Sequence, residues 1–238
     1  MTIDAAAATP RGVAGGPESP WLLALHSSSE CLGVAAQRLD GSEPLRLAAF
    51  PLGRALSAAL LDCVESVLPA AEWPRLGRLA VATGPGGFTG TRLTVALART
   101  LAQQLALPLD GVGSFRLIAQ RLRNQAAVPP GLLWVVQELP RRGQVAALYG
   151  PDPQNPVAIL ELSAPCLYRE PAALVEAEAK LVHTSSGAPV PRCRAEVQQP
   201  HDVAELLRCS QAAAAAGQGA PWSPVLPLYP TSPVDGGT

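Results

Sequence analysis

The stretch VATGPGGFTGTR, residues 81–92, concentrates glycine at a turn where chemistry is possible. Gly84, Pro85, Gly86, Gly87 and Gly90 lie between an apolar run and a long helical pattern. A turn that opens a helix presents free backbone N–H groups and the positive end of the helix dipole, so it suits a phosphate. The same glycines would let a second backbone come close, because they carry no side chain. The residues alone leave both interpretations open.

The two common phosphate-binding motifs do not fit this turn. The dinucleotide fingerprint G-x-G-x-x-G, counted from Gly84, needs a sixth-position glycine, and Thr89 stands there. The Walker A motif needs a lysine after its last glycine, and Gly90 is followed by Thr91. Thr89 is a candidate N-cap for the helix that follows.

The other side chains that could do chemistry are scattered. The three histidines, His26, His183 and His201, are not paired at helical spacing. The five cysteines form no C-x-x-C pair; they are Cys31, Cys63, Cys166, Cys193 and Cys209. This spacing predicts free thiols and neither a zinc site nor a disulfide framework. We therefore predict no catalytic residue, no metal and no cofactor.

The hydrophobic pattern predicts the elements that position the turn. In the first half, we expect strands at 21–29, 31–39, 45–51, 78–84 and 108–113, and helices at 56–71, 88–107 and 114–125. In the second half, we expect strands at 132–139, 144–150 and 157–162, and helices at 171–182 and 201–217. Within the helix after the glycine turn, one apolar stripe recurs every fourth residue, at Leu93, Leu97, Leu101 and Leu105.

This order predicts an α/β fold in which the second half is an eroded copy of the first. We divide the chain into a disordered tail (1–19), an N-terminal lobe (20–126), a degenerate C-terminal lobe (127–216) and a Pro/Gly-rich tail that packs on the surface (217–238).

The net charge and the hydrophobic pattern of the chain argue against some classes of function. The chain has 238 residues, 48% of them hydrophobic, and a formal net charge of −1. A protein that binds nucleic acid by itself usually has a basic excess, so we do not expect this chain to bind tRNA or DNA on its own. Neither a leader peptide nor an apolar run of membrane-spanning length is visible, so we expect a cytoplasmic protein without membrane contact.

The segment TGPGGFTGTRLTVALARTLA strongly resembles the G-P-G-S-F-T-G-x-R signature of the TsaB (YeaZ) family, with Gly87 where the family usually has serine. The resemblance implies an actin/hexokinase-like (ASKHA) fold of two ribonuclease-H-like lobes. It also implies a non-catalytic subunit in threonylcarbamoyladenosine modification of tRNA. Such a subunit pairs with a TsaD-type enzyme through its first two helices, and a TsaE-type ATPase joins the complex.

That pairing predicts the site. By the resemblance and the helical period, the interface residues would be Leu56, Ala59, Cys63, Gly86, Gly87, Phe88, Thr89, Gly90, Arg92, Thr94 and Ala98. A homodimer through the same helices is a further expectation.

The chain departs from the family at further places. His26 stands where ASKHA enzymes carry an aspartate that helps hold a metal–phosphate, and imidazole does not replace a carboxylate around a hard cation. The ending PLYPTSP is similar to the family's Pro-x-Tyr-x-Arg, but Ser232 and Pro233 follow instead of arginine. Two alternatives stay open: an ASKHA-type ATPase or phosphotransferase, and a peptidase-like enzyme acting alone.

Overall fold

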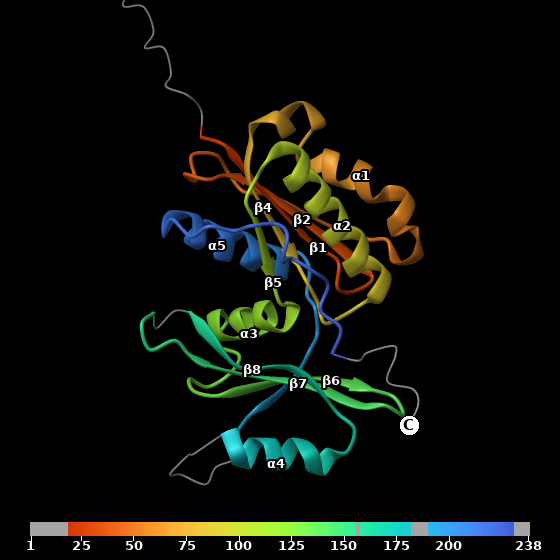
Figure 1. Ribbon diagram of the computed structural model, residues 1–238, viewed down its shortest axis with the longest axis vertical. Coiled ribbons are helices and arrows are strands. Elements are labelled where there is room, and N and C mark those ends of the chain that lie inside the picture. The colour runs from red at the N-terminus through yellow and green to blue at the C-terminus, as the bar shows by residue number, and fades with distance from the viewer. Residues whose placement is uncertain (1–18, 156–157, 182–189, 231–238) are drawn as a thin grey trace, which may run out of the picture.

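The computed structural model describes residues 19–155, 158–181 and 190–230 (Figure 1). The predicted N-terminal tail lies outside these ranges except for its last residue. His183, Ser232 and Pro233 lie outside them as well.

The first sheet has five strands in the order β3-β2-β1-β4-β5. They are β1 (Trp21–His26), β2 (Cys31–Arg38), β3 (Arg46–Pro51), β4 (Leu76–Ala82) and β5 (Leu109–Val112). Strands β1, β2 and β3 form an antiparallel meander, while β4 and β5 run parallel to β1. Every residue of β1 is buried, because helices cover both faces of the sheet. This is the predicted ribonuclease-H-like arrangement.

The second sheet has four described strands in the order β8-β7-β6-β9. They are β6 (Leu133–Leu139), β7 (Gly143–Pro151), β8 (Ile159–Tyr168) and β9 (Arg192–Arg194). Strand β6 pairs antiparallel with β7, β7 antiparallel with β8, and β6 parallel with the short β9, which the sequence pattern missed. The order of these four strands and their relative directions repeat those of β3-β2-β1-β4 in the first sheet. Among the described residues, the second lobe is therefore a shortened copy of the first.

Five helices of the described residues complete the layers, whose arrangement Figure 1 shows. They are α1 (Leu56–Val67), α2 (Phe88–Leu105), α3 (Ser114–Asn124), α4 (Pro171–Leu181) and α5 (His201–Ala215), with short 3-10 turns at Gly53–Ala55 and Ala70–Arg75. Helices α1 and α2 cover the outer face of the first sheet, α3 and α5 lie between the two sheets, and α4 covers the far face of the second. None of the helices in the described part of the chain has the length and apolar character to cross a membrane.

The middle layer joins the two halves of the chain. Val203 and Leu206 of α5 pack on the first sheet, although α5 comes last in the sequence. Phe115 of α3 packs on the second sheet, although α3 belongs to the first half. A buried ion pair of 2.7 Å between Arg121 and Asp202 connects the two helices. The boundary drawn at residue 126 therefore separates the two sheets but not the hydrophobic cores.

The chain after α5 crosses the first sheet and α2. We call residues 217–230 the C-terminal strap. Arg99 Nη1 donates to the Val225 carbonyl oxygen at 2.6 Å, and the Leu228 N–H donates to the Thr83 carbonyl oxygen at 2.7 Å. The Val225 side chain is buried in the first core. The described part of the predicted tail therefore packs on the protein, and part of it reaches the core.

Candidate functional site

The glycine turn is a point of close backbone contact. Gly87 N–H donates to the Ser28 carbonyl oxygen at 2.7 Å. A Cβ atom on Gly86 would overlap the same carbonyl, and one on Gly90 would lie 2.5 Å from the carbonyl oxygen of Ser27. The start of α2 thus rests directly on the turn that follows β1. Of the two interpretations of the turn, the close approach of a second backbone is the one that these distances support.

A buried polar cluster lies under the turn. Ser114 Oγ donates to Ser28 Oγ at 2.7 Å, and Thr91 Oγ1 donates to it at 3.4 Å. His26 Nδ1 accepts a bond of 3.4 Å from the Ser28 N–H. Within the described residues, His26 Nε2 and Ser27 Oγ have no hydrogen-bond partner. The cluster joins β1, α2 and α3 through hydroxyl groups and one imidazole.

The histidine in this cluster is neutral. Complete burial lowers the pKa of His26 from 6.5 to about 3, because the imidazolium ion would lose its hydration. Among the described residues, no group of three or more His, Cys, Asp or Glu side chains is placed to hold a metal ion. The cluster offers neither a charged base nor a carboxylate at the end of β1.

The predicted interface residues fall into three classes of burial. Gly86, Gly87, Phe88, Thr89 and Arg92 are exposed; Ala59 and Cys63 are half-buried; Leu56, Gly90, Thr94 and Ala98 are buried. The exposed residues lie at the start of α2. The helix begins at Phe88 with Gly87 as its N-cap and no side-chain cap, so the prediction of Thr89 as the cap is wrong.

The predicted outward orientation of α2 is also wrong. Thr94 and Ala98 are fully buried in the core that α2 shares with the first sheet. Leu93 and Leu97, which the four-residue repeat marked as the core stripe, are only half-buried and flank that core. The reason is steric: small side chains on one helix face let the helix approach the sheet closely, and Leu93 and Leu97 pack beside them against the same core. Leu56 and Gly90 are likewise unavailable to another protein.

Of the residues that form the outer surface of α1 and α2, the sequence predicted Phe88 and Thr89 but missed Ser57, Leu61, Ala96 and Thr100. We call Ser57, Leu61, Phe88, Thr89, Ala96 and Thr100 the α1–α2 face; all six are exposed. Leu61 has 50% of its surface exposed and Phe88 has 51%. On α2, Thr89, Ala96 and Thr100 are seven and four residues apart, a spacing that places them on one ridge, and Phe88 directly precedes Thr89. Searching for apolar or small residues opposite the buried ones would have found this ridge.

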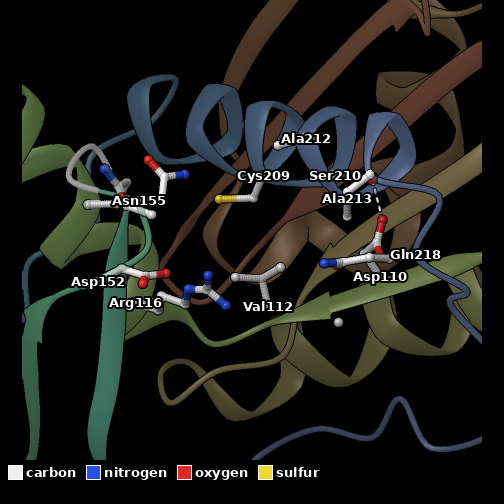
Figure 2. Close-up of a pocket in the computed structure, with 14 residues that line it drawn as sticks. Asp110, Val112, Arg116, Asp152, Asn155, Cys209, Ser210, Ala212, Ala213 and Gln218 are labelled. Carbon is white, nitrogen blue, oxygen red and sulfur yellow. Dashed lines mark hydrogen bonds between the residues drawn. The ribbon is translucent and has the colours of Figure 1, made fainter.

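Two pockets are relevant to the site, and only the first adjoins α1 and α2. The first has a volume of about 400 Å³ and lies between the starts of α1 and α2, with Arg54, Ser57 and Phe88 in its wall. Figure 2 shows the second, of about 420 Å³, between β5, α3 and α5, with Arg116 and Cys209 in its wall. Burial raises the pKa of the Cys209 thiol, so this group is not an activated nucleophile. No predicted site residue lines the second pocket.

The class of the protein follows from its two lobes. Two sheets of ribonuclease-H type, stacked through shared helices, define an actin/hexokinase-like (ASKHA) fold. Two solved structures from Pseudomonas aeruginosa are similar to it. One is described as an uncharacterized protein with similarity to the peptidase YeaZ; its TM-score is 0.66 and its identity 20%, over 89% of this chain and 100% of the other. The second is YeaZ, with a TM-score of 0.62 and 19% identity over 88% and 99% of the two chains.

The sequence comparisons are more specific. The tRNA threonylcarbamoyladenosine biosynthesis protein TsaB of Bacillus subtilis (strain 168) is 32% identical over 126 residues. That alignment covers 52% of each chain, so this chain spans about half the length of the curated relative it matches. The family model of TsaD, described as tRNA N6-adenosine threonylcarbamoyltransferase, matches residues 52–147. By sequence, the chain is similar to TsaB over about half its length and to the TsaD family model over residues 52–147, and it shares the fold of the two YeaZ-type structures.

Proposed function

We propose that this chain is a non-catalytic subunit in threonylcarbamoyladenosine modification of tRNA, and that it binds a TsaD-type enzyme through the α1–α2 face. The name of the Bacillus subtilis relative supports the pathway. The segment matched by the TsaD model, residues 52–147, contains α1, the glycine turn and α2. In this proposal the protein is cytoplasmic, a TsaE-type ATPase joins the pair, tRNA is contacted indirectly, and the same face permits a homodimer.

The observation that carries the proposal is the uncovered outer surface of α1 and α2. Both helices bury one side in the first core, and on their outer side Leu61 keeps 50% and Phe88 51% of its surface exposed. Around these apolar side chains, Thr89, Ala96 and Thr100 are small, so a second helix can approach closely. Exposed apolar groups with small neighbours are typical of a helix-docking surface.

The end of β1 supports a role without catalysis. In the proposed subunit, His26 occupies the place of the metal-holding aspartate of ASKHA enzymes, and burial keeps its imidazole neutral. A buried neutral imidazole does not supply the negative oxygen ligands that Mg²⁺ prefers.

The test is the mass of a mixture of this chain with the TsaD-type protein of its own organism, measured by light scattering after size-exclusion chromatography. We expect a 1:1 species for the wild type. Leu61→Arg and Ala96→Arg should each abolish it, because a charge would be buried in the contact. Val175→Arg is the matched control: Val175 has 56% of its surface exposed and lies on α4, which Figure 1 places on the opposite side of the molecule.

Two results would contradict the proposal. One is a wild-type chain that stays separate from the TsaD-type protein across salt concentrations and with nucleotide present. The other is pairing that survives both arginine substitutions. Titration calorimetry with ATP and magnesium on the isolated chain then distinguishes an ATPase acting alone from a non-catalytic subunit, because the ATPase should bind nucleotide.

A further inference from the structure

The exposed side chains at the start of α2 contact the C-terminal strap. The rings of Phe88 and Tyr229 have centroids 5.1 Å apart. The Arg92 guanidinium lies 3.9 Å from the Phe88 ring centroid, and its Nε donates to the Tyr229 hydroxyl at 2.8 Å. Phe88 and Arg92 belong to α2, whereas Tyr229 belongs to the C-terminal strap. We call these three side chains the Phe88–Arg92–Tyr229 stack.

The strap presents Tyr229 at a defined place. One residue earlier, the Leu228 N–H donates to the Thr83 carbonyl oxygen at 2.7 Å, immediately before the glycine turn. Further back, Arg99 Nη1 donates to the carbonyl oxygens of Ser223 at 2.9 Å and Val225 at 2.6 Å. The main chain is therefore anchored on both the sheet and α2 before it reaches the stack. Pre-organised side chains lose little conformational freedom when a partner binds.

The stack retains unused binding capacity. Phe88 still has 51% of its surface exposed, and Arg92 is exposed as well. Arg92 uses only its Nε in the stack; within the described residues it has no ion pair, and its two terminal nitrogens donate no hydrogen bond. A guanidinium with free terminal nitrogens matches a carboxylate, and aromatic and arginine side chains are the groups that dominate the energy of protein interfaces.

We propose that the C-terminal strap is part of the docking surface, and that the stack is an anchor point for an acidic side chain of the partner protein. The inference rests on the proposed function, because the stack adjoins the α1–α2 face at Phe88 and extends it toward the strap. The partner's carboxylate binds the terminal nitrogens of Arg92, and an apolar group next to it covers Phe88 and Tyr229. Tyr229 acts as a positioning residue that orients the Arg92 guanidinium.

The experiment measures the dissociation constant of the pair with the TsaD-type protein by titration calorimetry at two salt concentrations. Tyr229→Ala and Arg92→Gln should each raise the constant by roughly tenfold or more, as expected for interface anchors. Arg92→Glu should raise it further, and Arg92→Gln should reduce the salt dependence, because one charge pair is lost. Tyr229→Phe removes only the hydroxyl contact, so its effect should be smaller.

Two controls accompany these variants. Val175→Ala changes an exposed residue of α4, outside both the strap and the α1–α2 face, and it should leave the constant within about twofold of the wild type. Hydrogen exchange of the Leu228 amide reports whether the strap remains docked in each variant. If the Leu228 amide exchanges faster in Tyr229→Ala, the strap has detached in that variant, and the dissociation constant of Arg92→Gln is then the deciding measurement. The anchors of the strap at Arg99 and Thr83 do not involve Arg92.

The outcomes are distinguishable. If Leu61→Arg abolishes pairing while Tyr229→Ala and Arg92→Gln pair like the wild type, the inference is wrong and the proposed function stands. If Tyr229→Ala pairs more tightly, the strap covers the surface instead of extending it, and the inference is also wrong. If the wild-type chain does not pair at all, the proposed function fails and the inference fails with it.

Discussion

Replacement of Gly90 by alanine tests the reason for the glycine turn. The new Cβ atom would lie 2.5 Å from the Ser27 carbonyl oxygen and 2.7 Å from Ser27 Oγ. The hydroxyl can rotate away, but the carbonyl belongs to the backbone that follows β1, the central strand of the first sheet. Either α2 or this backbone must move, and both are packed on the same core.

The expected magnitude is the difference of two terms. Inserting an extra methyl group into a packed site costs about 1–3 kcal/mol, whereas alanine favours a helix over glycine by up to about 1 kcal/mol. We therefore expect a net loss of about 1–2 kcal/mol in the free energy of unfolding. For a chain of this size, that loss lowers the melting temperature by about 2–8 °C.

Gly87→Ala is the matched control. A Cβ atom at Gly87 meets nothing closer than 3.7 Å, and the residue has φ −57°, which alanine adopts readily. Urea unfolding followed by circular dichroism should give a wild-type midpoint for Gly87→Ala and a lower midpoint for Gly90→Ala. Equal midpoints for the two variants would refute the argument that close backbone approach explains the glycine at position 90.

Two further predictions concern buried ionisable groups. His26 has a pKa of about 3 when folded and 6.5 when unfolded, so the unfolded state binds the extra proton between these values. Stability should fall as pH drops from about 6.5 toward 3, by up to about 1.4 kcal/mol per pH unit, and His26→Asn should remove this slope in urea titrations at several pH values; an unchanged slope would contradict the burial of a neutral imidazole. Asp202→Ala should cost about 3 kcal/mol, because it leaves Arg121 buried without its carboxylate. Arg208→Ala should cost less than Asp202→Ala, because Arg208 is 57% exposed and its buried partner Glu205 keeps a hydrogen bond of 2.9 Å from Asn124 Nδ2; similar losses in thermal unfolding for both variants would contradict this ranking.

Local sequence signals predicted most of the elements. The aliphatic runs of β1, β4 and β6 and the helical periods of α1 and α2 identify both type and order, because a strand or helix must place its apolar residues on its buried face. The three-residue strand β9 was missed, because so short a segment carries no period. The turn between Gly84 and Gly90 was visible because at Gly86 and Gly90 only glycine tolerates the approach of another backbone.

The sequence by itself determined the order of the elements, the class of fold and the position of the turn, since each depends on residues that are neighbours along the chain. Tertiary structure decided which face of α2 meets the sheet, because the helical period relates residues to one another but does not say which side is covered. In the folded protein, Thr94 and Ala98 are buried against the first sheet and Ala96 is exposed. Tertiary structure also placed Tyr229 on Phe88, a contact between segments that no local pattern connects, because it depends on how the strap crosses the completed first sheet.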